Sequence, residues 1–142
     1  MIKRSEVLSA PIRAGKMYET AGILMTAAEK ENIEIAEFGL SDLEHEGLEL
    51  VTYLNRDRYC AKELALFPGQ TCLEHRHPSG GGKPEKIETF RCWRGLVWLY
   101  VEGEHVPQIK AKVPKKSEQY YTVFHEIELH PDTSDSDMAV TH

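Results

Sequence analysis

Residues 69–95 read GQTCLEHRHPSGGGKPEKIETFRCWRG, a stretch with the spacing Gly-x5-His75-x-His77-x10-Glu88-x6-Gly. In a β-strand the side chains of residues i and i+2 lie on one face, so we expect His75 and His77 to face the same way. If that face lines a small barrel, both imidazoles and the Glu88 carboxylate can meet at one divalent metal. Mixed nitrogen and oxygen ligation suits a borderline or hard ion such as Mn, Fe, Zn or Ni. The stretch therefore predicts a metal site.

A simpler interpretation of the histidine pair has to be weighed against this site. Histidines two residues apart also occur on solvated strands, and Glu88 could be an ordinary surface residue. The glycine at each end and the downstream glutamate favour the metal site. On a strand Glu88 would also share a face with Phe90 and Cys92, where a carboxylate is costly to bury unless it is paired or coordinated.

The composition places limits on the class of protein. A chain of 142 residues has a typical length for one domain and can bury roughly two thirds of its unfolded surface. The net charge of -6 argues against nucleic acid or an anionic membrane as a partner. No apolar run approaches the roughly 20 residues that span a bilayer, and the first residues lack a signal-peptide core. Three cysteines without CxxC spacing predict free thiols and a cytoplasmic protein.

The first 32 residues have helical character. We expect Ser5 to cap a helix that runs to about Tyr18. The apolar stripe of this helix would consist of Val7, Leu8 and Ile12. The pattern Thr26-Ala-Ala-Glu29 is a capping box, which predicts a short second helix.

Alternating residues from Ile33 onward predict strands. The expected strands are a hairpin of 48–54 and 59–67, then 71–77, then 88–101 with a break at 94–95, and finally 120–129. Short strands with regular turn signals predict a mainly β fold, a sandwich or a barrel. We expect a single domain over 1–142, in which a helical segment at 1–32 precedes barrel strands at 33–130. The acidic tail at 131–142 lacks strand periodicity, so the C-terminal strands of the barrel are expected to be incomplete.

Several stretches of the sequence resemble a known family. The run from Gly69 to Gly95 resembles the first signature of the cupin superfamily, with an enlarged gap between His77 and Glu88. The stretches NRDRYCAKELALFPGQTCLEHRHPSGGGKPEKIETFRCWRGLVWLYVEGE and YYTVFHEIELHP closely resemble the D-lyxose ketol-isomerase family. The resemblance runs from the first helix to about Pro131 and covers most of the chain.

This resemblance implies a fold, a cofactor and a reaction. The fold would be a cupin-type (jelly-roll) β-barrel with short N-terminal helices, in a homodimer. The family holds Mn2+, or another divalent metal such as Co2+, Fe2+ or Zn2+, through two histidines, one glutamate and a further histidine. His75, His77 and Glu88 fall on the first three ligand positions. The sugar reactions implied are D-lyxose to D-xylulose and D-mannose to D-fructose.

The fourth ligand is expected on a later strand that follows a Pro-Gly turn and a Pro-Pro-Asn-Thr-like segment. Neither feature is present, and Asp132 replaces the turn glycine. His142 follows Thr141 at nearly the distance where the last histidine of the family would come. As a terminal residue it would be poorly held, so a frayed tail is the expectation there.

Two lysines are candidate catalytic residues. Lys86 lies two residues before Glu88, and Lys62 shares a strand face with Cys60 and Leu64. A lysine inside the barrel could stabilise an enediolate or take part in proton transfer, whereas the alternative for each is a solvent-facing side chain. Glu74 is beside the ligands, but strand alternation turns it to the outer face, and the general base is not assigned.

Two rival functions remain open at this stage. Three histidines and one glutamate around iron would equally serve a metal-dependent cupin oxygenase. An incomplete metal site would instead fit an inactive isomerase relic or a sugar-binding protein.

Overall fold

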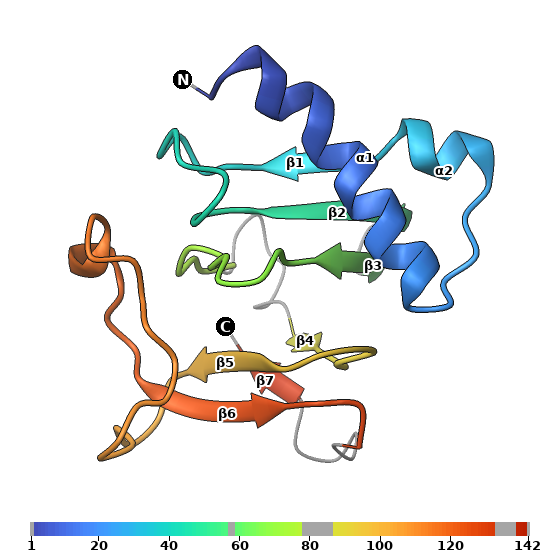
Figure 1. The fold of residues 1–142 in the computed structure, drawn as a ribbon. Coiled ribbons are helices and arrows are strands. Elements are labelled where there is room, and N and C mark those ends of the chain that lie inside the picture. The colour runs from blue at the N-terminus through green and yellow to red at the C-terminus, as the bar shows by residue number, and fades with distance from the viewer. Residues whose placement is uncertain (1, 57–58, 78–86, 133–138, 142) are drawn as a thin grey trace. The chain divides into compact units, whose positions relative to one another are not determined.

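The structure is a computed structural model that describes residues 2–56, 59–77, 87–132 and 139–141 (Figure 1). The chain forms two compact units, Met1–Leu73 and Glu74–His142, which we describe separately. Most of the regular elements are strands, and the helices lie at the N-terminus, as the sequence predicts. Neither α-helix in the described part of the chain is long and apolar enough to cross a membrane.

Helix α1 spans Arg4–Thr20, so Ser5 lies inside it and the predicted cap is wrong. The Glu6 carboxylate accepts a hydrogen bond from the Lys3 backbone N–H at 2.8 Å, and this contact begins the helix. The predicted apolar stripe is also wrong, because its members are 43–64% exposed; they are Val7, Leu8 and Ile12. The residues that α1 buries are instead spaced four apart on another face; they are Ala10, Ala14 and Tyr18.

Helix α2 spans Ala27–Glu31 and has the predicted capping box. The Thr26 hydroxyl accepts a hydrogen bond from the Glu29 N–H at 3.2 Å. In return, the Glu29 carboxylate accepts one from the Thr26 N–H at 2.7 Å. This reciprocal pair satisfies backbone donors that the first turn of a helix otherwise leaves open.

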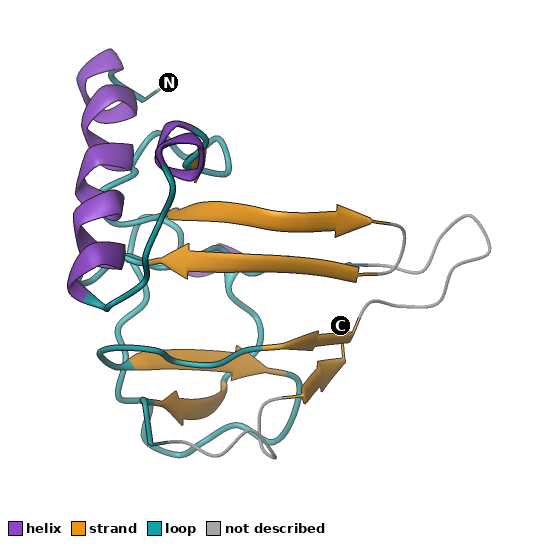
Figure 2. Ribbon diagram, turned by 90° about the vertical axis from the view of Figure 1, so that its right-hand side faces the viewer, coloured by secondary structure: helices purple, strands orange, loops and turns teal. Residues whose placement is uncertain are grey.

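The sheet of the first unit contains β1 (Glu34–Ala36), β2 (Leu48–Arg56) and β3 (Tyr59–Ala65) in the antiparallel order β1-β2-β3. The predicted hairpin is confirmed as β2 and β3. Helix α1 contacts all three strands and lies across one end of the β2–β3 hairpin, which extends beyond it (Figure 2). The first four residues of β2 are accordingly buried and the last four are exposed.

The core of the first unit forms between α1 and this sheet. The Tyr18 hydroxyl donates to the carbonyl oxygens of Glu49 and Glu63, at 3.2 and 3.1 Å, and so ties the helix to β2 and β3. The buried residues that pack together are Ala10, Ala14, Tyr18, Ile33, Leu43, Val51, Ala65 and Phe67. The small alanines on α1 let the helix backbone approach the sheet closely.

Gly47 precedes β2 in a conformation that a larger residue would strain. Its φ is +147°, and a Cβ atom there would lie 2.7 Å from the Ala36 carbonyl oxygen and 2.8 Å from Leu43 Cδ1. We expect Gly47→Ala to lower the free energy of unfolding by about 2 kcal/mol in urea denaturation. Gly22→Ala is the matched control, because Gly22 has φ +79° but no atom within 4 Å of its Cβ position. An equal loss in both variants would show that the overlap at Gly47 contributes nothing.

The second unit contains two two-stranded antiparallel sheets. Strands β5 (Val97–Val101) and β6 (His125–Leu129) form one, and β4 (Ile87–Thr89) and β7 (Ala139–Thr141) form the other. A 3-10 turn, η1 (Glu118–Tyr120), precedes β6. The core of this unit consists of Phe90, Cys92, Val97, Leu99, Ile127 and Leu129.

Four strand predictions need correction in this part of the chain. The strand expected over 88–101 forms only as β4 and β5, because residues 90–96 belong to no strand. Residues 72–77 form no strand, and Thr71 makes only an isolated bridge to Glu46. The strand expected over 120–129 begins only at His125. The tail, expected to lack strands, contributes β7, which pairs with β4. The described residues thus form sheets of three, two and two strands and no closed barrel, and the cupin barrel stays a prediction.

Candidate metal centre

The structure brings His75, His77 and Glu88 together in the second unit. One potential ligand atom from each residue lies within 4.8 Å of the others. His77 Nε2 is 3.3 Å from Glu88 Oε1, and the two imidazole rings meet edge to face with centroids 5.0 Å apart. The Glu88 side chain is 17% exposed and that of His77 is 34% exposed, whereas His75 lies at the surface. The group is therefore open to solvent on its His75 side.

The spacing of these atoms fits a divalent metal. Ligand atoms about 2.1 Å from one ion are about 3 Å apart when adjacent and about 4 Å apart when opposite. The 3.3 Å between His77 Nε2 and Glu88 Oε1 matches the spacing of adjacent ligands. All three potential ligand atoms lie within 4.8 Å of one another, so they would need to move only slightly closer together to bind one ion. Two neutral imidazoles and one carboxylate leave a net charge of +1 on a divalent ion, and suit Mn, Fe, Co or Zn.

Glu74 connects residues 72–77, the segment that carries both histidines, to Thr122 and Val123. Residues 72–77 belong to no strand, so strand alternation does not explain why the two imidazoles meet. The Glu74 carboxylate accepts hydrogen bonds from the Thr122 backbone N–H, from the Thr122 hydroxyl at 2.6 Å and from the Val123 N–H at 3.3 Å. Burial alone would raise the pKa of the Glu74 carboxyl, but these hydrogen bonds and the Arg76 charge outweigh it and hold the pKa below its usual value.

Arg76 forms a second connection from the same segment. Its guanidinium lies 3.2 Å from a carboxylate oxygen of Glu102, which follows β5. Both side chains are more than two-thirds exposed, so water and salt screen this ion pair. We therefore expect this ion pair to add little to the stability of the segment.

Strand β4 and the residues after it position Glu88. Glu88 pairs with Val140 in β7, which fixes its backbone. Phe90 packs against the buried Cys92, whose thiol lies 3.6 Å from the carbonyl oxygens of Arg94 and Gly95. Burial raises the pKa of the Cys92 thiol, and Cys92 packs with Leu129 in the core of this unit.

The two glycines that bound the motif have a conformational role. Gly69 and Gly95 have φ values of +82° and +85°, which are unfavourable for residues with a side chain. A Cβ atom added at either glycine would have no neighbouring atom within 4 Å. The two turns thus require glycine because of its backbone freedom. A lack of space for a side chain is not the reason that glycine is found at these positions.

The other predicted site residues are placed as follows. Lys62 is exposed on β3 in the first unit, opposite Thr52. Lys86 and His142 lie outside the described residues. The structure therefore assembles the three predicted ligands and leaves the two lysines as predictions.

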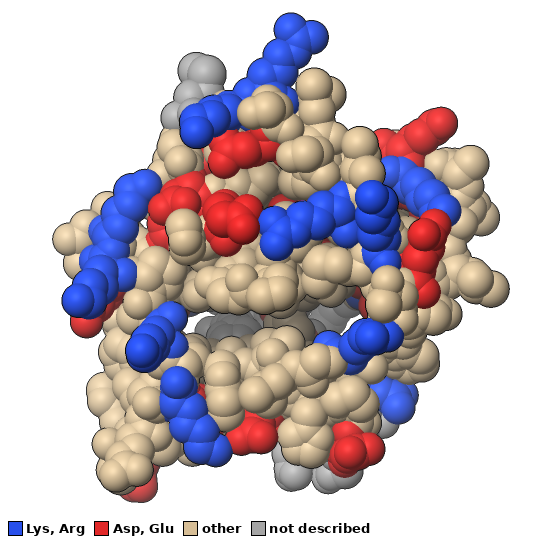
Figure 3. All heavy atoms as spheres, viewed as in Figure 1, with Lys and Arg blue, Asp and Glu red and all other residues tan. Residues whose placement is uncertain are grey.

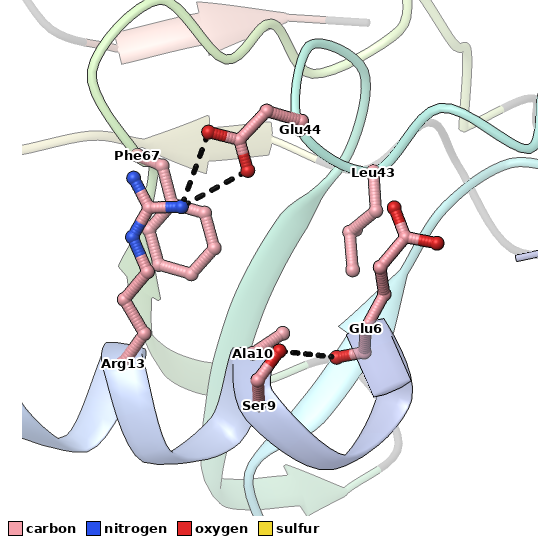
Figure 4. A pocket seen from close by; sticks show the side chains of 7 residues that line it. All are labelled: Glu6, Ser9, Ala10, Arg13, Leu43, Glu44 and Phe67. Carbon is pink, nitrogen blue, oxygen red and sulfur yellow. Dashed lines mark hydrogen bonds and ion pairs between the residues drawn. The ribbon is translucent and has the colours of Figure 1, made fainter. Parts of the chain in front are cut away.

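Figure 4 shows a hollow beside α1 in the first unit, with a volume of about 40 Å³. The Arg13 guanidinium lies 3.8 Å from the Phe67 ring centroid and bonds the Glu44 carboxylate at 3.0 and 3.3 Å. The volume is close to that of one water molecule and far below the roughly 300 Å³ of small-ligand sites. This hollow cannot hold a sugar, and the Arg13 charge already has a partner.

A second hollow, of about 310 Å³, lies along α1 near α2. Its one carboxylate, Glu19, is paired with Lys30, so it offers no set of metal ligands. Basic and acidic side chains are interspersed over the face that carries α1 (Figure 3).

Comparison with known proteins finds relatives that match most of this chain. A D-lyxose/D-mannose isomerase of Thermosediminibacter oceani is 59% identical over 131 residues, which are 92% of this chain and 72% of the relative. A D-lyxose ketol-isomerase of Cohnella laeviribosi is 57% identical over 130 residues, 92% of this chain and 71% of the relative. A D-lyxose ketol-isomerase of Thermofilum sp. is 48% identical over 131 residues, 92% and 73% of the two chains. No protein-family model matches the chain.

Proposed function

Because this chain belongs to the D-lyxose ketol-isomerase family, we propose that it is a metal-dependent aldose–ketose isomerase that interconverts D-lyxose and D-xylulose. The observation that carries this proposal is the group formed by His75, His77 and Glu88, whose ligand atoms lie within 4.8 Å of one another. We extend the proposal to D-mannose and D-fructose, because one relative is named for both D-lyxose and D-mannose.

The proposed cofactor is Mn2+, with Co2+, Fe2+ and Zn2+ as alternatives. His75, His77 and Glu88 would hold it, and when bound it would supply positive charge that polarises the sugar carbonyl. The partial burial of Glu88 and His77 would strengthen their electrostatic attraction for the ion relative to bulk water. The exposed His75 leaves a path by which the sugar can enter.

The reaction moves a proton between C1 and C2 of the sugar through an enediol. The chain must supply a base that takes this proton from one carbon and returns it to the next. We propose Lys86 and Lys62 as the groups that stabilise the negative charge of the enediolate or assist the proton transfer. Support for Lys86 comes from its position two residues before Glu88.

Three further properties are proposed from the family. The strands and N-terminal helices are compatible with a cupin barrel, although the described residues form no closed barrel. The homodimer is proposed on family resemblance alone. A cytoplasmic location is supported by the three cysteines, Cys60, Cys72 and Cys92, which are all free thiols.

The proposal is tested by anaerobic incubation of the chelator-treated protein with D-lyxose, with and without added Mn2+. We expect D-xylulose to form only after Mn2+ is restored, because the apoprotein lacks the charge that stabilises the enediolate. Isomerisation without oxygen would exclude an oxygenase as the explanation. Stoichiometric Mn2+ binding without turnover would instead identify an inactive relic, and absence of metal binding would remove the proposed site.

A further inference from the structure

We propose that Glu74 is a positioning residue for the metal centre, because its carboxylate fastens the segment that carries His75 and His77 to Thr122 and Val123. The proposal rests on the proposed metal-dependent function. It assigns Glu74 no contact with the metal or the sugar. Its role is to set where the two imidazoles lie.

The contacts of Glu74 are suited to that role. Both carboxylate oxygens are used: Oε2 accepts from the backbone N–H groups of Thr122 and Val123, and Oε1 accepts from the Thr122 hydroxyl at 2.6 Å. Hydrogen bonds to an ionised acceptor are roughly twice as strong as those between neutral groups. Because two carboxylate oxygens accept from three donors, these contacts fix the orientation of the carboxylate and its distance from Thr122 and Val123.

The histidine segment needs such a connection because residues 72–77 form no strand. Metal ligands must be held to within about 0.5 Å of their productive positions. Thr122 and Val123 precede β6, which pairs with β5 along its whole length and ends at the buried Leu129. Through Glu74, the position of the neighbouring His75 is therefore set by a sheet-supported part of the unit.

Glu126 provides a matched comparison within the same unit. Its carboxylate likewise accepts hydrogen bonds from two successive backbone N–H groups, those of Lys110 and Ala111, and from one hydroxyl, that of Tyr100. It thus connects β6 to a loop by the same chemistry. Glu126 is not adjacent to any of the three ligands, so its removal measures the general cost of losing such a connection.

The test measures Co2+ and Mn2+ affinity by calorimetry, together with the visible absorption spectrum of the Co2+-loaded protein. We expect Glu74→Ala to bind both ions 10- to 100-fold more weakly than the wild type and to shift the Co2+ spectrum. Glu126→Ala should lose a similar amount of stability in urea denaturation but keep its affinity within about threefold and its spectrum unchanged. If Glu74 contributed only to the stability of the fold, its replacement would leave the absorption spectrum of bound Co2+ unchanged.

A second pair of variants keeps the test decisive if Glu74→Ala does not fold. Thr122→Val removes the hydroxyl but keeps the backbone N–H, and we expect an intermediate loss of affinity, which Thr122→Ser restores. Unchanged affinity and spectrum in Glu74→Ala and Thr122→Val would overturn the positioning role while leaving the proposed function intact. Conversely, a wild-type protein that binds Co2+ but does not convert D-lyxose would refute the proposed isomerase while the effect of Glu74 could still be measured.

Discussion

Replacement of His77 by alanine is expected to weaken Mn2+ binding by more than about 100-fold and to remove detectable conversion of D-lyxose. Loss of residues that merely orient ligands costs about 10- to 100-fold in metal affinity, so loss of a ligand should cost more. His77 lies at the centre of the group, 3.3 Å from Glu88 and in ring contact with His75. Calorimetric titration with Mn2+ and an anaerobic assay of D-xylulose formation measure the two effects.

Glu88→Gln and His105→Ala complete this experiment. Glu88→Gln keeps the size of the side chain but removes the only anionic ligand of the group, so it should lose affinity to a similar degree. His105 is an exposed histidine whose ring lies 5.5 Å from that of Phe124, outside the group, and its replacement should leave Mn2+ affinity unchanged. Retention of Mn2+ binding in His77→Ala and Glu88→Gln would show that the metal binds elsewhere.

The grouping of His75, His77 and Glu88 could be predicted because their spacing is visible in one short stretch of the sequence. The reason given for their convergence, alternation along a strand, is nonetheless not what the structure shows, because residues 72–77 form no strand. The same assumption placed Glu74 on an outer face without a function. Its three hydrogen bonds go to Thr122 and Val123, almost fifty residues away, and no local pattern indicates such contacts.

In the fold, too, features that depend on neighbouring residues could be predicted, whereas contacts between distant residues could not. The capping box at Thr26 and the β2–β3 hairpin depend on neighbouring residues and are confirmed. The pairing of β4 with β7 joins Glu88 to Val140, and such distant pairing leaves little trace in sequence periodicity. The prediction of the buried face of α1 is wrong because hydrophobicity alone favours Leu8 and its neighbours. Close packing of a helix on a sheet instead favours small residues such as Ala14.

Two buried carboxylates were also not predicted. Alternation along β2 places Glu49 on the face opposite Leu48 and Leu50, yet Glu46 and Glu49 are both 0% exposed. The reason is that the first four residues of β2 are buried on both faces. A period-two pattern identifies a strand with one solvated face and fails where both faces are covered.

Glu49 should make the stability of the protein depend on pH. Neither carboxylate oxygen accepts a hydrogen bond from the residues that the structure describes. Burial raises the pKa of Glu49 to about 7, although the Gln70 side chain and the Arg13 charge oppose this rise. The Gln70 amide is itself engaged, since its oxygen accepts from the Phe67 N–H at 2.8 Å and its nitrogen donates to the Leu43 carbonyl at 2.7 Å. The protonated form of Glu49 is therefore the one that the fold favours.

The sign of the effect follows from this raised pKa. The unfolded chain loses the Glu49 proton near pH 4.5, whereas the folded protein keeps it until about pH 7. Stability is therefore unaffected by this group below pH 4.5, falls as the pH rises towards 7, and is lower by about 3 kcal/mol above it. The uncharged Glu49→Gln variant lacks this loss, so its free energy of unfolding relative to the wild type should increase by about 3 kcal/mol between pH 4.5 and pH 8.

Urea denaturation across this pH range measures the difference, and a difference between two pH values cancels any constant cost of fitting the glutamine amide. Glu31→Gln, which removes the same charge from the exposed end of α2, should change the relative free energy by less than about 0.5 kcal/mol over the range. Parallel pH profiles for Glu49→Gln and the wild type would mean that the Glu49 charge is solvated or paired in solution. A free energy of unfolding relative to the wild type that rises with pH for Glu49→Gln but not for Glu31→Gln requires that the fold holds the Glu49 carboxylate away from water. This is the environment that α1 and the sheet create around it.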